Sequence, residues 1–373
     1  MTVDRFLIAG GGTSGHVNPA LAVAEQLIAD NPRAEIIFAV TEDGIERGLI
    51  EEAGYPHHII RATRFPDKSP RSIFHFIKET LSGYRTGRKM IKRYRPKAVL
   101  GTGGFVCAPL MLAAALSRVP YVLHEQNAFP GKSNRFFAGK AKAVCVSFPG
   151  TDKYWSKKAR LVETGNPVKR VFFTRSRREA RQILGIGDDE FVISVMGGSL
   201  GAKSINETLT EFIKRGYWQI LKSDYPQIRL AVGTGIRNSG EYLEVLKDAE
   251  GIDADTYIDA EAWIPASDLF IGRAGASACM ECAAVGLPSI FVPFPLAAND
   301  HQTANAAQFV EEGASLMIKD DELNAPVLYE AVKVFLKDKS KRDSMAAAAK
   351  RLAKPDAAED IAAILNSDGK RYE

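Results

Sequence analysis

The sequence predicts an α/β protein with two doubly wound halves, because one pattern of apolar strand, glycine-rich turn and helix occurs twice. In the first copy, a strand at 6–9 runs through a glycine-rich turn into a helix at 19–29. In the second copy, the strand at 191–196 leads to the glycine-rich turn 197–201 and to a helix from Ser204. Two such units indicate two Rossmann-like domains, each built on a parallel sheet.

A turn-rich break near 163–170 separates the two copies. We therefore expect an N-terminal domain over 1–164 and a C-terminal domain over 165–354. The apolar face of the tail predicts a helix within 355–373 that packs on the first domain. A chain of 373 residues is long enough for two such domains.

The remaining elements follow from short apolar runs, each of which ends at a polar or glycine-rich turn. The additional strands predicted this way are 36–40, a run from Ala98 into the turn 101–104, 121–123, 144–147 (the last strand of the first half), 229–232, 256–258, 269–271 and 289–293. The additional helices are a basic segment within 69–97, an Ala/Leu-rich helix ending at Leu116, a charged helix at 175–184 and an Ala-rich helix carrying Glu281. His124 and Glu125 would follow the end of the strand at 121–123. The polar loops thus fall at strand C-termini, where doubly wound sheets bind ligands.

The composition narrows the function classes. Hydrophobic residues make up 46% and charged residues 25%, which is typical of a soluble globular protein. Lys and Arg number 49 against 45 Asp and Glu, a balance that argues against a nucleic-acid binder. No apolar run approaches the roughly 20 residues of a membrane span, and the first residues lack signal-peptide features. The four cysteines are scattered, which favours a reducing cytoplasm, and the pair Cys279 and Cys282 is expected to be buried rather than metal-binding.

The first glycine turn matches a dinucleotide fingerprint, with Gly10, Gly12 and Gly15 between a strand and a helix. This leaves an NAD-dependent oxidoreductase open, with Glu42 or Asp43 as the ribose-binding acid. His16 is unusual there, because its ring would take up space that the pyrophosphate needs. His16 either hydrogen-bonds the loop or faces a ligand, and we favour the second.

The segment 269–306 predicts a sugar-nucleotide site. Its strand, small-residue turn and helix start present backbone N–H groups to an anion. An ordinary βαβ unit would have the same order of elements. The density of hydrogen-bonding side chains after Pro293 favours a binding site, and these are Asn299, Asp300, His301, Gln302 and Asn305.

The segment 69–97 is the most basic part of the chain and alternates charge with apolar bulk. This pattern predicts an amphipathic helix that lies at an anionic membrane surface. A core-packed helix with a solvated basic face remains an equal alternative. Nucleic-acid binding is a third interpretation, which the lack of a known binding module disfavours.

The motifs resemble those of the MurG family, the UDP-N-acetylglucosamine:undecaprenyl-diphospho-muramoylpentapeptide N-acetylglucosaminyltransferases of bacterial cell-wall synthesis. The matching blocks, in the family's order, are GGGTSGHVNPALAVA (10–24), GTGGFVCAPLMLAA (101–114), VLHEQNAFPGKSNR (122–135), GNPVKR (165–170), GGSLGAKSIN (197–206), RAGASACMECAAVGLP (273–288) and NDHQTANA (299–306). The resemblance implies the GT-B architecture, with two Rossmann-like domains facing a cleft. It also implies an inverting transfer of GlcNAc from UDP-GlcNAc to the 4-hydroxyl of lipid I, giving lipid II. The expected location is the cytoplasmic face of the bacterial cell membrane, as a peripheral protein that also contacts other cell-wall synthesis proteins.

The resemblance further implies roles for individual residues. Tyr257 and Ile258 would hold the uracil, Glu281 the ribose, and Gln302 and Asn305 the GlcNAc hydroxyls, with His301 beside them. The backbone of Ala276, Ser277 and Ala278 would bind the phosphates, and Arg273 and Lys169 would offset the UDP charge. Lys169 stands where many members have arginine, so Arg170 is its alternative, and Leu200 stands where other members have glutamine. The other substrate-binding residues are Thr13, Ser14, Gly15, Asn127 and Ser199.

Inversion at the anomeric carbon requires one base that takes the proton of the acceptor hydroxyl. His16 is the first candidate, because imidazole titrates near neutral pH, and His124 and Glu125 are the alternatives. No Asp-x-Asp-like cluster stands out, so we expect neither a tightly bound metal nor a cofactor. Other hypotheses that remain open are a glycosyltransferase with another acceptor, a UDP-GlcNAc epimerase and a non-catalytic sugar-nucleotide sensor.

Overall fold

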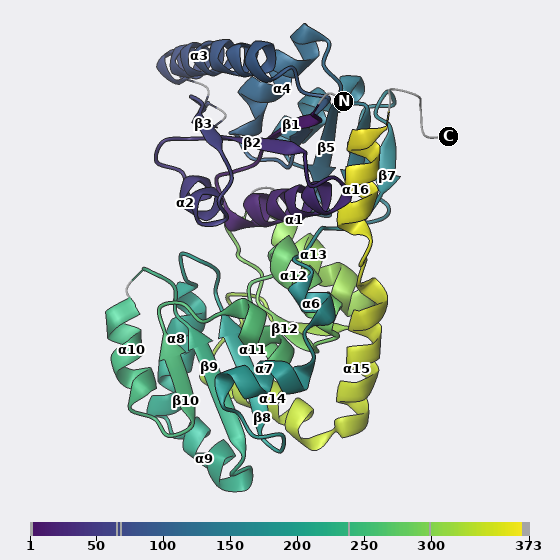
Figure 1. The fold of residues 1–373 in the computed structure, drawn as a ribbon. Helices are drawn as coiled ribbons and strands as arrows, with labels where there is room; N and C mark the ends of the chain where they lie inside the picture. The colour runs from purple at the N-terminus through teal and green to yellow at the C-terminus, as the bar shows by residue number, and fades with distance from the viewer. Residues whose placement is uncertain (1–2, 65, 68, 238, 298–299, 368–373) are drawn as a thin grey trace. The chain divides into compact units, whose positions relative to one another are not determined.

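The computed structural model describes residues 3–64, 66–67, 69–237, 239–297 and 300–367 (Figure 1). The chain divides into two compact units. The first unit comprises residues 1–169 together with 354–373, and the second comprises residues 170–353. Each unit is built on one parallel sheet, as the repeated pattern predicts.

The first unit has a seven-stranded parallel sheet in the order β3-β2-β1-β4-β5-β6-β7. Its strands are β1 (Arg5–Ala9), β2 (Glu35–Val40), β3 (His57–Ile59), β4 (Ala98–Gly101), β5 (Tyr121–Glu125), β6 (Ala143–Val146) and β7 (Leu161–Glu163). Its helices are α1 (Ser14–Asp30), α2 (Ile45–Glu52), α3 (Pro70–Tyr94), α4 (Cys107–Ser117), α5 (Lys132–Phe137) and α16 (Ala357–Asn366), with short 3₁₀ turns η1 (Ala138–Lys140) and η2 (Asp152–Tyr154).

The second unit has a six-stranded parallel sheet in the order β10-β9-β8-β11-β12-β13. Its strands are β8 (Phe191–Met196), β9 (Ile228–Gly233), β10 (Ile252–Asp255), β11 (Leu269–Gly272), β12 (Ser289–Phe291) and β13 (Ser315–Met317). Its helices are α6 (Val171–Thr174), α7 (Arg177–Leu184), α8 (Lys203–Lys214), α9 (Tyr217–Asp224), α10 (Ser239–Lys247), α11 (Ala260–Ala266), α12 (Ala276–Val285), α13 (His301–Glu311), α14 (Ala325–Lys337) and α15 (Lys339–Leu352).

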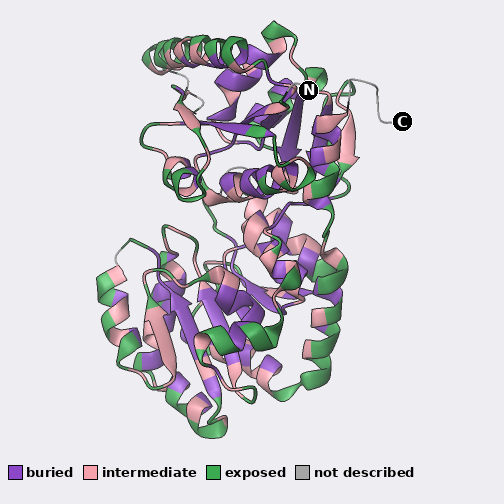
Figure 2. Cartoon of the chain, in the orientation of Figure 1, coloured by how far each residue is buried: buried purple, intermediate pink, exposed green. Residues whose placement is uncertain are grey.

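Both faces of the first sheet are buried, which strand β1 illustrates (Figure 2). Phe6 and Ile8 pack into one apolar cluster with residues of α1 and α16, and Leu7 and Ala9 pack into another with residues of α4. Successive side chains of a strand point to opposite faces, so helices on both sides require an apolar run rather than an alternation. The last helix, α16, lies beside α1 (Figure 1).

Three strands were not predicted from the sequence, namely β3, β7 and β13. All three are edge strands, and their sequences are His-His-Ile, Leu-Val-Glu and Ser-Leu-Met. An edge strand is covered less than a central one and needs no continuous apolar run, so its pattern is weak. The same reason explains the fourth edge strand, which occupies Ile252–Asp255 instead of the predicted 256–258.

Two predicted boundaries next to the candidate sites were wrong. Helix α1 begins at Ser14, not at Pro19, and includes Pro19 in its second turn. A proline inside a helix loses one backbone hydrogen bond, and the buried, largely apolar side chains from Val17 to Ala24 offset this loss. His124 and Glu125 are the last residues of β5, not loop residues, and both are buried.

Candidate functional site

The glycine turn after β1 is tightly packed against the end of β4. A Cβ added at Gly10 would lie 1.8 Å from Thr102 Oγ1, so only glycine permits this approach. Gly12 has φ +86°, a left-handed conformation that glycine adopts without strain. The turn therefore requires glycine for its own geometry, whether or not a dinucleotide binds.

Glu46, in the first turn of α2, accepts a backbone N–H of the glycine turn that a dinucleotide-binding turn would offer to the pyrophosphate. Its fully buried carboxyl group accepts hydrogen bonds from Gly12 N at 3.1 Å, from Thr41 N at 3.1 Å and from Thr41 Oγ1 at 2.5 Å. The predicted ribose acids, Glu42 and Asp43, are exposed instead. Because the N–H of Gly12 is already bonded, this turn does not offer it to a pyrophosphate, and the oxidoreductase interpretation loses its support. Sequence reasoning missed Glu46, which looks like an ordinary first-turn helical acid.

His16 lies in the first turn of α1, next to the N-cap residue Thr13. Its Nδ1 lies 2.9 Å from Thr13 Oγ1, and its carbonyl accepts a hydrogen bond of 2.7 Å from Thr102 Oγ1. The imidazole edge faces Gly103, where an added Cβ would lie 2.8 Å from His16 Cδ2. The ring is half-buried and held at a fixed place on the carboxyl edge of the sheet, with Ser14 and Gly15 in the same helical turn.

His124 is fully buried, and both of its ring nitrogens are engaged within the protein. Nε2 donates to the carbonyl of Gly165 at 3.1 Å, and Nδ1 accepts from Gln126 Nε2 at 3.0 Å. Burial lowers the pKa of His124 to about 4, so the ring is neutral at pH 7. These contacts disfavour His124 as the base that takes a proton from a substrate.

Glu125 is likewise buried and holds the loop that follows β5. Its carboxyl oxygens accept from Asn127 N and Nδ2, each at 3.2 Å, and from Gly131 N and Asn134 Nδ2, each at 2.9 Å. Burial raises the pKa of Glu125, and these hydrogen bonds oppose the rise. Glu125 therefore orders the loop that carries Asn127, and of the three base candidates His16 is the one that is partly exposed.

In the second unit, the turn after β8 meets the segment after β10. The Tyr257 hydroxyl donates to the carbonyl of Ser199 at 3.0 Å, while the ring stays more than half exposed. Ile258 is partly buried beside Gly233. These residues form one edge of the candidate nucleotide site, and Leu200 in the same turn is exposed.

Helix α12 starts at this same carboxyl edge. Gly275 is its N-cap and offers no side-chain cap, and the first turn, Ala276 to Ala278, carries no acidic residue. The buried Ser277 Oγ makes no hydrogen bond with any described residue. Glu281 lies four residues after Ser277, on the same helical face, and is partly buried. A helix start with no side-chain cap and no acidic residue suits a phosphate group.

The polar residues after β12 divide into two kinds. His301 and Gln302 are partly exposed in the first turn of α13, and Gln302 Oε1 accepts from Phe294 N at 3.0 Å. Asn305 is fully buried and donates its amide to the carbonyl of Ala274 at 3.1 Å. The sugar contact of Asn305 stays a prediction, and in this structure its side-chain amide holds the turn before α12. Asn299, which sequence reasoning also singled out, lies outside the described residues.

Arg273 and Lys169, the two cations expected to offset the UDP charge, have different surroundings. The guanidinium of Arg273 pairs with Asp320 and bonds Ser204, two residues that sequence reasoning missed. Asp320 follows β13, a strand that the sequence did not reveal. Lys169 is partly buried at the end of the first unit, and Arg170 is exposed.

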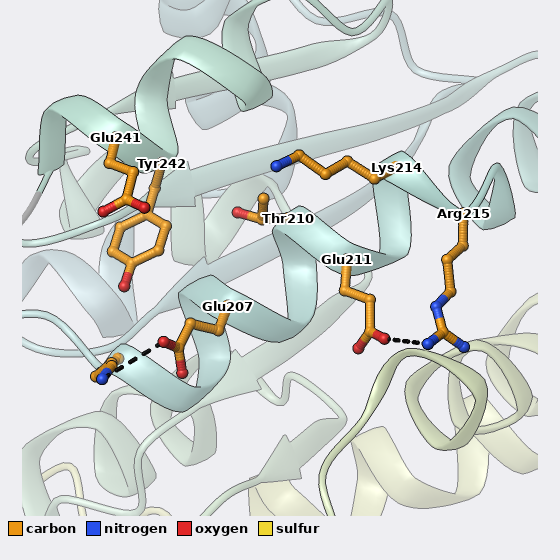
Figure 3. A pocket seen from close by; sticks show the side chains of 8 residues that line it. Glu207, Thr210, Glu211, Lys214, Arg215, Glu241 and Tyr242 are labelled. Atoms are coloured by element: carbon orange, nitrogen blue, oxygen red, sulfur yellow. Dashed lines mark ion pairs between the residues drawn. The ribbon is translucent and has the colours of Figure 1, made fainter.

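A surface cavity lies elsewhere, between α8 and α10 (Figure 3). Its volume is about 580 Å³, and its lining side chains are mostly charged. Lys203 pairs with Glu207 at 3.5 Å and Arg215 with Glu211 at 2.6 Å, so these charges largely satisfy one another. Its lining contains none of the predicted site residues.

Within the described part of the chain, no group of three or more His, Cys, Asp or Glu residues could hold a metal ion. No helix there is long and apolar enough to cross a bilayer.

Comparison with known proteins identifies the class. The N-terminal domain model of glycosyltransferase family 28 matches residues 6–146, and the C-terminal domain model matches residues 192–361. With two parallel-sheet Rossmann-like units, these matches define a glycosyltransferase of the GT-B architecture.

Individual relatives narrow this class. The chain is 36% identical to the UDP-N-acetylglucosamine--N-acetylmuramyl-(pentapeptide) pyrophosphoryl-undecaprenol N-acetylglucosamine transferase of Acetivibrio thermocellus, over 97% of each chain. It is 34% identical to the transferase of the same name from Desulforamulus reducens, over 96% of each chain. The crystal structure of Acinetobacter baumannii MurG matches with a TM-score of 0.74 and 28% identity, covering 98% of this chain and 99% of that one. This chain belongs to the MurG family of N-acetylglucosamine transferases, which confirms the resemblance of its motifs.

Proposed function

We propose that this protein transfers N-acetylglucosamine from UDP-GlcNAc to the 4-hydroxyl of undecaprenyl-diphospho-MurNAc-pentapeptide, which converts lipid I into lipid II. The observation that carries this assignment is the identity of 36% over 97% of both chains with a transferase named for that donor and acceptor. The site geometry is consistent with it, because the second unit offers an anion-binding helix start and the first a partly exposed imidazole.

The donor binds at the carboxyl edge of the second sheet. The first-turn N–H groups of α12 and the Ser277 hydroxyl bind the diphosphate, because that helix end has no side-chain cap or acidic residue. Glu281, one turn further along the same face, accepts the ribose hydroxyls. The uracil lies against Tyr257 and Ile258, and Gln302 binds hydroxyls of the sugar.

The acceptor binds on the first unit, where His16 acts as the base. Nε2 of His16 takes the proton of the 4-hydroxyl as that oxygen attacks the anomeric carbon. The bond between this carbon and the diphosphate oxygen breaks, and UDP leaves with the electron pair, stabilised by the N-terminus of α12. Attack from the face opposite the leaving group inverts the anomeric centre.

Helix α3 makes the membrane contact of the first unit. Its N-terminal half presents four exposed apolar residues on one face, Ile73, Phe74, Ile77 and Leu81, of which Phe74 is 70% exposed. Exposed basic residues flank them, namely Arg71, Lys78, Arg85, Arg88, Lys89 and Lys92. The C-terminal half instead packs against α4 through Gly83, Gly87, Met90 and Ile91. The C-terminal half of this helix is thus core-packed, and the membrane-facing interpretation is proposed for the N-terminal half alone.

This contact places the protein peripherally at the cytoplasmic face of the cell membrane, where its lipid-linked acceptor lies. Replacing Phe74 and Ile77 with serine should lower the affinity for anionic phospholipid vesicles by about tenfold or more, as measured by co-sedimentation. Turnover of a short-chain, soluble acceptor should not change. The control is Ile183→Ser, which removes a similarly exposed apolar residue from α7 in the other unit. Equal vesicle binding by both variants would exclude α3 as the contact. Contacts with other cell-wall synthesis proteins stay a prediction.

The function is tested by measuring UDP release from UDP-GlcNAc with a short-chain lipid I analogue. We expect release that depends on the acceptor and a product with the inverted linkage. Release without acceptor, or a donor returned with an epimerised sugar, would assign a different reaction. Tight donor binding without any turnover would assign a sugar-nucleotide sensor.

A further inference from the structure

The guanidinium of Arg273 is bound inside the protein rather than presented at the surface. The Arg273 side chain is only 11% exposed. Its Nη1 donates to the carbonyls of Val292 at 3.1 Å and Pro293 at 3.2 Å, and to the carboxylate of Asp320. Its Nη2 donates to Ser204 Oγ at 2.9 Å, and that hydroxyl donates to Asp320 Oδ1 at 2.6 Å. The charge of Arg273 is therefore balanced, and these donor atoms already have acceptors.

These partners come from separate segments that meet at the carboxyl edge of the second sheet. Arg273 directly follows β11, Val292 and Pro293 follow β12, Asp320 follows β13, and Ser204 is the second residue of α8, which follows β8. Strands β8, β11, β12 and β13 are neighbours in the sheet. A planar guanidinium with several fixed donors can hold four strand ends in register, which the single ammonium of a lysine could not do.

One peptide group links Arg273 to a predicted sugar-binding residue. The carbonyl of Pro293 accepts from Arg273, and the N–H of the same peptide, that of Phe294, donates to Gln302 Oε1 at 3.0 Å. The Phe294 ring also lies under the guanidinium, 5.4 Å from its carbon. Because a peptide group is planar and rigid, fixing its carbonyl also fixes the direction of its N–H. Arg273 thereby orients the side-chain amide of Gln302.

We propose that Arg273 and Asp320 are positioning residues that hold Gln302 for recognition of the donor sugar, and that Arg273 is not a ligand of the UDP phosphates. The proposal rests on the function proposed above and assigns its sugar specificity to a buried ion pair. It replaces the expectation that Arg273 offsets the charge of UDP. Asp320 is the decisive partner, because removing its charge releases Arg273 without removing the guanidinium.

The test compares Asp320→Asn with Asp321→Asn, a matched change at the neighbouring exposed carboxylate. Calorimetric titration with UDP should give a Kd within about twofold of wild type for both variants, because UDP lacks the sugar that Gln302 contacts. Asp320→Asn should lower kcat/KM for UDP-GlcNAc by about tenfold or more and reduce its preference over UDP-GalNAc. Asp321→Asn should change neither quantity. Arg273→Lys should behave like Asp320→Asn.

A second comparison separates positioning from loss of folding. If Asp320 acts through Gln302, then Asp320→Asn combined with Gln302→Ala should lose no more sugar preference than Gln302→Ala alone. Additive losses would overturn the proposal. So would Arg273→Lys weakening UDP and UDP-GlcNAc equally, which is the behaviour of a phosphate ligand.

The binding measurements need no acceptor, so they report on Arg273 even if lipid I proves not to be the substrate. Should Asp320→Asn not fold, Asp320→Glu keeps the charge and shifts its position. It must then alter sugar preference while leaving the Kd for UDP within about twofold, or the proposal fails.

Discussion

Glu46 and Gly12 are 34 residues apart, yet Glu46 Oε2 accepts the backbone N–H of Gly12 at 3.1 Å. The contact engages a backbone N–H that a dinucleotide-binding loop would donate to the pyrophosphate. It makes the first glycine turn a structural element that presents the start of α1, and with it His16.

Replacing Glu46 with glutamine should destabilise the first unit. The new amide group cannot accept from Gly12 N, Thr41 N and Thr41 Oγ1 together, so at least one buried donor loses its acceptor. We expect a loss of about 1–3 kcal/mol in the free energy of unfolding, measured by urea denaturation. Glu42→Gln, an exposed change on the same loop, should stay within about 0.5 kcal/mol. If both variants were equally stable, the buried contact would have no net value. NADH should not bind either variant or the wild type.

A methyl group at Gly103 should displace the imidazole of His16. The added Cβ would lie 2.8 Å from His16 Cδ2, and φ at Gly103 is +102°, where side chains are strained. We expect Gly103→Ala to reduce kcat by about tenfold or more, since small misplacements of a base have large effects. Its UDP affinity should remain unchanged.

Gly48→Ala is the control for this change, because nothing lies within 4 Å of the new methyl group in helix α2. That substitution should stabilise the protein by roughly 0.5–1 kcal/mol and leave kcat alone. Normal turnover in Gly103→Ala would remove His16 from the role of base.

His124 should make the protein less stable in acid. Its pKa is about 4 in the folded state against about 6.5 when unfolded, so the unfolded state binds more protons between these values. Stability therefore falls as the pH drops through this window, by about 2 kcal/mol between pH 7.5 and pH 5. Urea unfolding at the two pH values measures the loss in wild type and in His124→Gln. The loss in the free energy of unfolding should be smaller in His124→Gln than in wild type by that amount. An equal loss in both proteins would show that other groups cause the acid destabilisation.

The donor site should depend on Ser277 and Glu281 separately. Ser277→Ala removes the hydroxyl at the start of α12, and Glu281→Gln removes the charge that we propose accepts the ribose hydroxyls. Each variant should weaken UDP binding by about tenfold, measured by calorimetric titration. Ser277→Ala should bind uridine with wild-type affinity, because uridine has no phosphate, whereas Glu281→Gln should weaken uridine as well. Identical losses for uridine in both variants would contradict the assigned contacts.

Much of this fold was predictable from local patterns. Central strands such as β1, β8 and β11 are short apolar runs before small-residue turns, because both faces of a parallel sheet are covered. The edge strands β3, β7 and β13 were not predictable, since strands at an edge need less apolar surface. The motifs also pointed to the family, and both domain models and the relatives bear this out.

The sequence alone determined the two repeated α/β units, the family and the side chains available for chemistry, because these depend on local pattern and residue type. Only the tertiary structure decided which of those side chains are buried in contacts within the protein and which stay partly exposed. Hydrogen bonds within the protein engage both ring nitrogens of His124, and Asn305 is fully buried. His16 and Gln302, in contrast, stay partly exposed. The roles of Glu46 and Asp320 could be recognised only in the tertiary structure, because their hydrogen-bond partners lie far away in the chain. Long-range hydrogen bonds and desolvation set the role of a polar side chain, and neither can be predicted from the residues next to it in sequence.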